Sequence, residues 1–199
     1  MIAFLGDSIV RGISMTEAFG QPYPALWAAA TGAGVQNFGL GGDASGVESA
    51  VYTGGARQRL LDLVLPHGYE EGVYIAIGAN DVIQRVPAAT TLANIEAMIQ
   101  ACQAAGVQRV VLGEVAPQNA ADGAQNTLIS TINAGINAFP ATYPFVAVAH
   151  LHARLANPGD TTQLKASANC GDGLHLSAAG HQDALAELLE VQAFGRSAL

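Results

Sequence analysis

The feature that most constrains the fold of this chain is a regular alternation of short apolar segments with longer segments of helical periodicity. Five short segments are rich in β-branched or aromatic residues and are bounded by Gly, Pro or polar residues, which is typical of buried strands. They are Ile2–Leu5, Val35–Phe38, Val73–Ile77, Val110–Val115 and Phe145–Ala149. Because strands that are apolar throughout need cover on both faces, we expect a parallel sheet between two helical layers.

The longer segments predict the helices of those layers. They are Tyr23–Thr31, Val47–Leu65, Thr91–Ala105, Gln125–Phe139, and a last helix from the N-cap Ser177 through Leu189. Pro140 is expected to end the fourth of these helices. The predicted architecture is a three-layer α/β/α fold around a flavodoxin-like, doubly wound, five-stranded parallel sheet, and residues 1–199 are expected to form a single domain.

The composition narrows the classes of partner. Half of the residues are hydrophobic, only 12% are charged, and the formal net charge is −8 with a single lysine, Lys165. An acidic surface repels phosphate backbones and anionic lipid, so we expect no nucleic-acid partner. No apolar run reaches the length of a transmembrane span, and Ile2–Leu5 is too short for a signal peptide. We therefore expect a soluble protein, cytoplasmic unless a leader has been removed.

The two cysteines, Cys102 and Cys170, form neither a CxxC pair nor a metal-ligand cluster. Two free thiols are the expectation, and a single disulfide is the alternative for an exported protein.

Polar clusters follow three of the predicted strands, where ligands bind in sheets of this kind. Ser8, in Gly6-Asp7-Ser8-Ile9, follows the first strand, where it presents a hydroxyl to solvent or acts as an ordinary helix N-cap. Asn80, in Gly78-Ala79-Asn80-Asp81, follows the third strand. Its carboxamide offers two N–H donors to a developing oxyanion, or with Asp81 it simply builds a turn.

A glycine-rich loop follows the second strand, and its backbone N–H groups can approach a ligand closely. Gly39, Gly41 and Gly42 compete for that role, and we favour Gly42 by its place before Asp43. The same segment also fits a G-x-G-x-x-A dinucleotide fingerprint. That fingerprint belongs after the first strand of its unit, and Asp62, at the spacing of its acidic partner, lies inside a predicted helix.

The fourth cluster is Asp172-Gly173-Leu174-His175, before the last helix. A separation of three in a turn brings the carboxylate back to the imidazole, where it fixes the tautomer and leaves Nε2 as a base. The alternative is a helix-entry turn with an exposed histidine.

Other histidines allow a different interpretation. His150 and His152 follow the fifth strand as His-x-His, and with Asp160 they suggest a metal. A zinc site usually needs at least three protein ligands, and no clear third ligand accompanies them. His181 lies within the last predicted helix and is expected at the surface.

The order Ser, Gly, Asn and Asp-x-x-His resembles that of the SGNH hydrolases, a subgroup of the GDSL lipases and esterases. The resemblance spans Gly6 to His175. The Gly6-Asp7-Ser8 element is similar to the nucleophile block of the family, Gly42 to its oxyanion glycine, and Asn80 to its oxyanion asparagine. Asp172 and His175 are similar to the block that completes the triad.

Three positions separate the chain from common patterns. Ile9 stands where the family carries leucine, and Leu176 stands where many members carry proline. The G-x-S-x-G elbow of α/β-hydrolases is absent, because position 10 is valine.

The resemblance implies a serine hydrolase that cleaves carboxylic esters through an acyl-enzyme. It implies Ser8 as nucleophile, His175 as base, Asp172 as its orienting acid, and Ser8, Gly42 and Asn80 as oxyanion donors, with no metal or organic cofactor. The compact chain favours an open site and a short-acyl or acetyl ester of a small molecule or carbohydrate. The loop Pro117–Gly123 is the candidate specificity segment. An acyltransferase on the same triad and a non-catalytic carbohydrate-binding module are the alternatives.

Overall fold

A five-stranded, all-parallel sheet in the order β2-β1-β3-β4-β5 carries the fold of the computed structural model, which describes residues 1–14, 21–69 and 71–195. The strands are β1 (Ile2–Gly6), β2 (Val35–Gly39), β3 (Gly72–Ala76), β4 (Val110–Gly113) and β5 (Val146–Ala149). All five predicted strands are present, and the predicted doubly wound order is confirmed.

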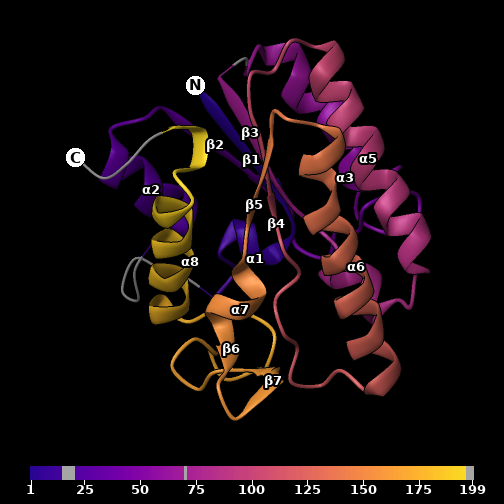
Figure 1. Ribbon diagram of the computed structural model, residues 1–199, viewed down its shortest axis with the longest axis vertical. Coiled ribbons are helices and arrows are strands. Elements are labelled where there is room, and N and C mark those ends of the chain that lie inside the picture. Colours follow the sequence, from indigo (N-terminus) through magenta and orange to yellow (C-terminus); the bar gives the residue numbers. More distant parts are fainter. Residues whose placement is uncertain (15–20, 70, 196–199) are drawn as a thin grey trace.

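Helices cover both faces of the sheet, as Figure 1 shows. On one face lie α2 (Tyr23–Thr31) and α8 (Ala178–Glu190). On the other lie α3 (Gly55–Arg59), α5 (Ala88–Ala104) and α6 (Gly123–Thr142). The predicted three-layer arrangement is therefore confirmed, and each helical layer packs on the sheet around a separate hydrophobic core.

The central strand β1 divides its side chains between these two cores. Ala3 and Leu5 belong to the cluster under α3, α5 and α6, whereas Ile2 and Phe4 belong to the cluster under α2 and α8. All five β1 residues are buried, as expected for a strand covered on both faces. Because β1 is held from both sides, the turn that follows it starts from a rigid base.

Several short elements whose bounds the sequence did not predict lie beyond the carboxyl ends of the strands, as Figure 1 shows. They are α1 (Ser8–Arg11), α4 (Ala79–Ile83), α7 (Leu151–Leu155) and the hairpin of β6 (Ala156–Asn157) and β7 (Asp160–Leu164). A π-helix (Leu60–Val64) and two 3-10 turns (Leu65–His67 and Ala193–Gly195) complete the described elements. Elements of four or five residues are too short to leave a periodic pattern, and tertiary contacts hold them in place.

The prediction of a helix over Val47–Leu65 is wrong in its first half. Helix α3 begins only at Gly55, and the helical path changes to a π-helix at Leu60. The Ser49 hydroxyl donates to the Asp43 carboxylate (2.7 Å) and accepts from the Val51 N–H (3.3 Å). Such local side-chain bonds compete with helical hydrogen bonding, so the segment before α3 forms turns.

The predicted end of the fourth helix before Pro140 is also wrong, since α6 continues to Thr142. Proline removes one N–H donor, but in the last turn that loss is small, and Tyr143 N–H still donates to the Phe139 carbonyl at 2.8 Å.

His181 is not a surface residue. Its side chain is 1% exposed, stacks on the Tyr23 ring (5.8 Å between centroids), and accepts a hydrogen bond from Tyr23 N–H at 3.3 Å. Burial lowers the pKa of His181 to about 4, so the imidazole is neutral at pH 7. The packing of α8 against α2 causes this burial.

Both cysteines are free thiols, with Cys102 buried and Cys170 exposed. None of the helices in the described part of the chain has the length and hydropathy of a membrane span.

Candidate active site

Ser8 lies at the tight turn between β1 and α1. Gly6 ends the strand, and a Cβ there would lie 2.4 Å from the Ala76 carbonyl oxygen, so only glycine allows the turn to pack. The Asp7 carboxylate caps α1 by accepting from Ile9 N–H at 2.9 Å. Asp7, and not Ser8, is therefore the N-cap of α1, and the Ser8 hydroxyl is available for other contacts.

The imidazole of His175 joins the hydroxyl of Ser8 to the carboxylate of Asp172. His175 Nε2 lies 2.8 Å from Ser8 Oγ, and His175 Nδ1 lies 2.6 Å from Asp172 Oδ2. The other oxygen of Asp172 accepts from the backbone N–H groups of Leu174 (2.9 Å) and His175 (2.8 Å). Three side chains separated by up to 167 positions thus form one hydrogen-bonded chain.

These bonds also set the charge of Asp172. Burial by itself raises the pKa of this carboxyl, but the hydrogen bonds from the His175 ring and from the two backbone N–H groups outweigh burial. The pKa of Asp172 therefore lies well below its ordinary value, and the group is a carboxylate at neutral pH.

The loop that carries His175 is held at several points. Asn169 Oδ1 accepts from the N–H groups of Gly171 (2.8 Å) and Gly173 (2.9 Å), and Cys170 N–H donates to the His175 carbonyl at 3.0 Å. Asn119, from the predicted specificity loop Pro117–Gly123, donates its N–H to the Gly173 carbonyl at 2.8 Å. The predicted specificity loop thus touches the loop of the candidate base.

The glycine-rich loop after β2 approaches Ser8 from the side. The Gly39 N–H is occupied by the Asn37 side chain at 2.8 Å. Gly41 lies next to Ser8, because a Cβ atom at position 41 would be 3.9 Å from Ser8 Cβ. Gly42 has φ +79°, which favours glycine, and within the described ranges neither Gly41 nor Gly42 donates its N–H to a protein acceptor.

The dinucleotide alternative does not fit this loop. The loop follows the edge strand β2 rather than the first strand, and it leads into turns instead of a helix N-terminus. Asp62, the expected acidic partner, lies in the π-helix and accepts from the Tyr52 hydroxyl and the Gln58 amide.

Asn80 sits in the first turn of α4, beside the glycine loop. One N–H of its carboxamide donates to the Asp43 carbonyl at 2.8 Å, which leaves the second N–H for another acceptor. Asp81 next to it is fully buried and accepts from Ser45 N–H at 2.9 Å and from the Thr91 hydroxyl at 3.1 Å. Burial raises the pKa of Asp81, although these hydrogen bonds act in the opposite direction. Through these hydrogen bonds Asn80 and Asp81 hold helix α4 against Asp43 and Ser45, which follow the glycine-rich loop.

Asp7 is the second buried carboxyl next to the serine, at 3% exposure. Burial raises its pKa to about 7, although the Ile9 N–H bond and the nearby His175 act in the opposite direction. Asp7 lines a cavity of about 20 Å³ with Tyr23 and Glu114.

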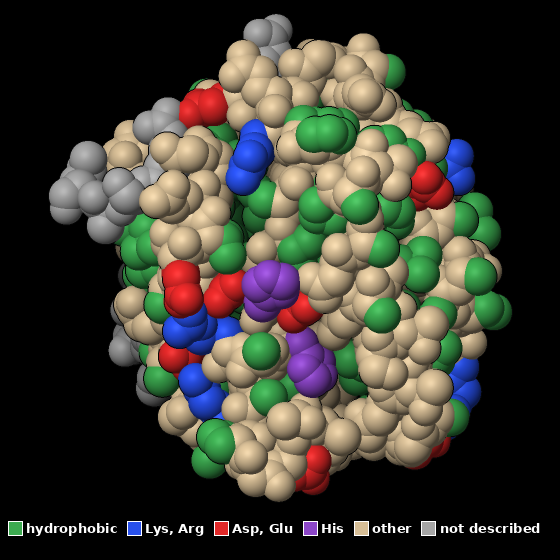
Figure 2. All heavy atoms as spheres, in the orientation of Figure 1, with side chains coloured by type: hydrophobic (Ala, Val, Ile, Leu, Met, Phe, Trp, Pro, Cys, Tyr) green, Lys and Arg blue, Asp and Glu red, His purple; other side chains and the backbone are tan. Residues whose placement is uncertain are grey.

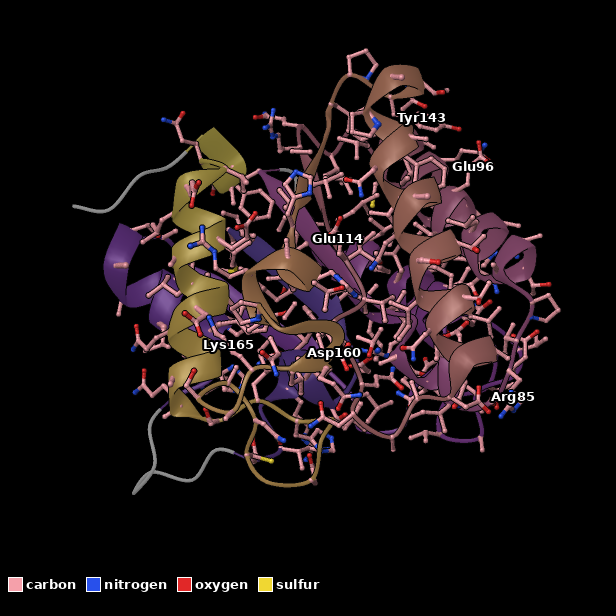
Figure 3. All side chains as sticks on the ribbon, turned by 60° about the horizontal axis from the view of Figure 1, so that its bottom comes forward. Arg85, Glu96, Glu114, Tyr143, Asp160 and Lys165 are labelled. Carbon is pink, nitrogen blue, oxygen red and sulfur yellow. The ribbon has the colours of Figure 1, made fainter. Side chains whose placement is uncertain are left out.

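The alternative metal ligands are not brought together. His150 Nδ1 faces Glu114 at 3.4 Å, whereas Asp160 accepts from Thr162 on its own hairpin. Figure 3 shows Glu114 and Asp160 on different elements, and Figure 2 shows histidine and charged side chains gathered on the face over α7 and α8. Among the described residues no group of three or more His, Cys, Asp or Glu side chains is arranged to hold a metal ion.

Sequence reasoning missed two polar residues of the site. Arg59 is 3% exposed and pairs with the fully buried Asp43. Asn169, described above, holds the loop of His175. No local pattern distinguished Arg59, because Arg57 and Gln58 directly precede it in the same predicted helix.

Comparisons with known proteins agree with the fold and with the family resemblance. A sequence profile of the GDSL-like Lipase/Acylhydrolase family matches residues 4–182. The match spans most of the chain, and the chain therefore belongs to this family, whose members are ester-hydrolysing enzymes. A search of curated proteins by sequence finds no significant match.

Solved structures of similar architecture superpose over nearly the whole chain. A protein assigned to the lipolytic G-D-S-L family from Desulfitobacterium hafniense is 18% identical, with a TM-score of 0.78, and the match covers 96% of this chain and 98% of that one. A GDSL-like lipase from Bacteroides thetaiotaomicron is 20% identical, with a TM-score of 0.74 and coverage of 98% and 87%. The esterase EstA from a Pseudoalteromonas species is 20% identical, with a TM-score of 0.70 and coverage of 96% and 94%.

Proposed function

We propose that this protein is a serine esterase in which Ser8, His175 and Asp172 act as a catalytic triad. The observation that carries the proposal is the hydrogen-bonded chain through the His175 ring, 2.8 Å to the Ser8 hydroxyl and 2.6 Å to the Asp172 carboxylate. With Asp172 ionised, the Nδ1 proton is directed to the carboxylate, and Nε2 remains free to accept the Ser8 proton.

The main sheet has cores on both faces, which supports a single domain over the described residues.

In the first half of the reaction, Ser8 Oγ attacks the ester carbonyl carbon as His175 Nε2 takes the hydroxyl proton. The negative charge that forms on the carbonyl oxygen is stabilised by the N–H groups of Ser8 and Gly42 and the second N–H of Asn80. The tetrahedral intermediate then collapses, the C–O bond to the alcohol breaks, and the imidazolium protonates the departing oxygen.

In the second half, water replaces the alcohol. His175 takes a proton from water, the resulting nucleophile attacks the acyl-serine, and collapse of the second intermediate releases the carboxylic acid while Ser8 recovers its proton. Water is the only co-reactant in this scheme.

The surroundings of the glycine loop support a short acyl group. Ile13 and Val51 are each 50% exposed, and they contact the positions where Cβ atoms of Gly41 and Gly42 would lie, at 2.6 and 3.0 Å. They offer a limited apolar surface next to the proposed oxyanion donors. We therefore propose short-acyl or acetyl esters of small molecules or carbohydrates as substrates.

Covalent labelling tests the proposal directly. A p-nitrophenyl alkylphosphonate should modify the protein once, and mass spectrometry of the digested protein should locate the adduct on Ser8. Ser8→Ala should abolish labelling and should leave little hydrolysis of p-nitrophenyl acetate beyond what substrate binding and the oxyanion donors supply, because the nucleophile is lost. Labelling at another residue, or hydrolysis retained by Ser8→Ala, would contradict the proposal. Phosphonate chemistry suits the test, since the EstA structure is of an enzyme inhibited by monoethylphosphonate.

A further inference from the structure

The side chain of Arg59 lies beneath the candidate site and contacts three separate segments. Its Nε and Nη2 atoms donate to Asp43 Oδ2 at 2.9 and 2.5 Å. Nη2 also donates to the Gly6 carbonyl at 2.8 Å, and Nη1 donates to the Phe38 carbonyl. One guanidinium group therefore joins the carboxyl ends of β1 and β2 to the glycine-rich loop.

Each of these contacts involves a residue that is close in sequence, or hydrogen-bonded, to a proposed oxyanion donor. Gly6 lies two residues before Ser8, so its carbonyl anchors the turn that orients the Ser8 N–H. Asp43 directly follows Gly42, and the carbonyl of Asp43 accepts the hydrogen bond that orients the Asn80 carboxamide at 2.8 Å. The Phe38 carbonyl fixes the start of the same loop. The three donors come from different elements, and the Arg59 side chain bonds to residues close in sequence to Ser8 and Gly42 and to Asp43, which binds Asn80.

The Arg59–Asp43 pair is fully enclosed, with side-chain exposures of 4% and 0%. Buried ion pairs can often be replaced by apolar residues without loss of stability, so burial alone does not account for the pair. A planar guanidinium that serves three acceptors in fixed directions gives a geometric account, which the point charge of lysine does not provide. The Ser49 hydroxyl occupies the other oxygen of Asp43 at 2.7 Å, so the carboxylate has little freedom to turn.

We propose that Arg59 is a positioning residue that fixes the relative positions of the Ser8, Gly42 and Asn80 donors. The inference rests on the proposed function, because it assigns Arg59 a role in forming the oxyanion site of that reaction. Donors must lie within a few tenths of an ångström of their best distance to the oxyanion. A misplacement of about 1 Å caused by a residue away from the reacting atoms can lower the rate roughly 10²-fold.

The test is Arg59→Lys, which keeps the positive charge and removes the fork. We expect kcat for p-nitrophenyl acetate to fall by roughly 10- to 100-fold with little change in KM, because donor geometry matters most in the transition state. Arg154→Lys is the matched control, since Arg154 pairs with Glu187 and Glu190 and contacts none of the three segments. Its kcat should equal that of the wild type.

A double-mutant cycle separates positioning from a general loss of structure. If Arg59 acts partly through Asn80, then Arg59→Lys should lower kcat by a clearly smaller factor in an Asn80→Ala background than in the wild type. Equal factors in both backgrounds, a change confined to KM, or a wild-type kcat in folded Arg59→Lys would each overturn the inference. Circular dichroism and thermal melting establish folding.

Two further measurements keep the outcome decisive. If Arg59→Lys does not fold, Asp43→Asn supplies the same test, because it weakens the charged contact and keeps the backbone carbonyl that binds Asn80. A wild-type protein that neither hydrolyses esters nor reacts with the phosphonate defeats the proposed function itself. An active wild type with an unaffected Arg59→Lys variant defeats only the role of Arg59.

Discussion

Replacing Asn80 by alanine tests oxyanion stabilisation at a single atom. The Asn80 amide nitrogen carries two hydrogens, and the Asp43 carbonyl occupies one of them at 2.8 Å. Only the other hydrogen is available to a substrate, so the substitution removes one of the proposed oxyanion donors. Loss of one such donor costs about 2.7–4 kcal/mol of transition-state stabilisation, which is roughly 10²- to 10³-fold in kcat.

The effect on stability should be much smaller. Asn80→Ala leaves the Asp43 carbonyl without its side-chain donor, but Asn80 is only partly buried and water can replace that bond. The expected loss is about 1 kcal/mol, at the low end for an unsatisfied buried group. For a chain of this length that loss lowers Tm by roughly 2–4 °C. A large loss of kcat together with a small change in Tm is therefore the expected signature.

The assay is steady-state hydrolysis of p-nitrophenyl acetate, with Tm measured on the same preparations. Asn80→Asp is the informative second variant, because it keeps the shape of the side chain, removes both donors and adds negative charge where the oxyanion forms. We expect Asn80→Asp to lose at least as much kcat as Asn80→Ala. A folded Asn80→Ala protein with near-wild-type kcat would refute the reasoning and remove Asn80 from the mechanism.

Three more outcomes follow from the structure. Asp172→Asn should lower kcat by roughly 10⁴, because the amide no longer fixes the required tautomer of His175, and steady-state kinetics that show wild-type turnover would contradict this role. Asp7, whose pKa is raised to about 7, favours the folded state when protonated, so its contribution to stability is present below pH 4 and is lost as pH rises towards 7. In urea unfolding measured against pH, the free energy of unfolding of Asp7→Asn should show no such decline. Above pH 7 it should exceed that of the wild type by up to roughly 4 kcal/mol. Parallel curves for the two proteins would argue against this role of Asp7. Phe4→Ala should cost about 3–5 kcal/mol in urea unfolding, because the fully buried Phe4 ring packs between Tyr23, Trp27 and Tyr74, and a loss below about 1 kcal/mol would show that the site refills.

Local sequence rules predicted the elements well where burial and periodicity agree. β1 and α2 lie within one residue of their predicted bounds, and Ser177 caps α8 by accepting from Gly180 N–H at 3.2 Å. The rules were wrong where side-chain hydrogen bonds competed with helical hydrogen bonding. The sequence predicted one long helix over Val47–Leu65, but the bonds of Ser49 hold the first part of that range in turns.

The candidate site shows the same division. Ser8 and Asn80 could be selected from the sequence, because they follow strands whose carboxyl ends meet at one edge of a parallel sheet. Asp172 and His175 could be selected by their separation of three residues and by the family resemblance. The choice among the glycines was harder, since each of them suits a tight loop. Only the fold shows that the Gly39 N–H is already occupied.

The sequence by itself determined the layered architecture and the family, because strand and helix periodicity and the order of the motifs are local properties of the chain. Tertiary structure alone decided the burial of His181, the extra elements α4 and α7, and the convergence of Gly6, Phe38 and Asp43 on Arg59. For Arg59, the physical reason is that a charged side chain can be buried only where partners distant in sequence supply the hydrogen bonds it needs. No sequence pattern contains those partners, since they become neighbours only when the sheet has formed.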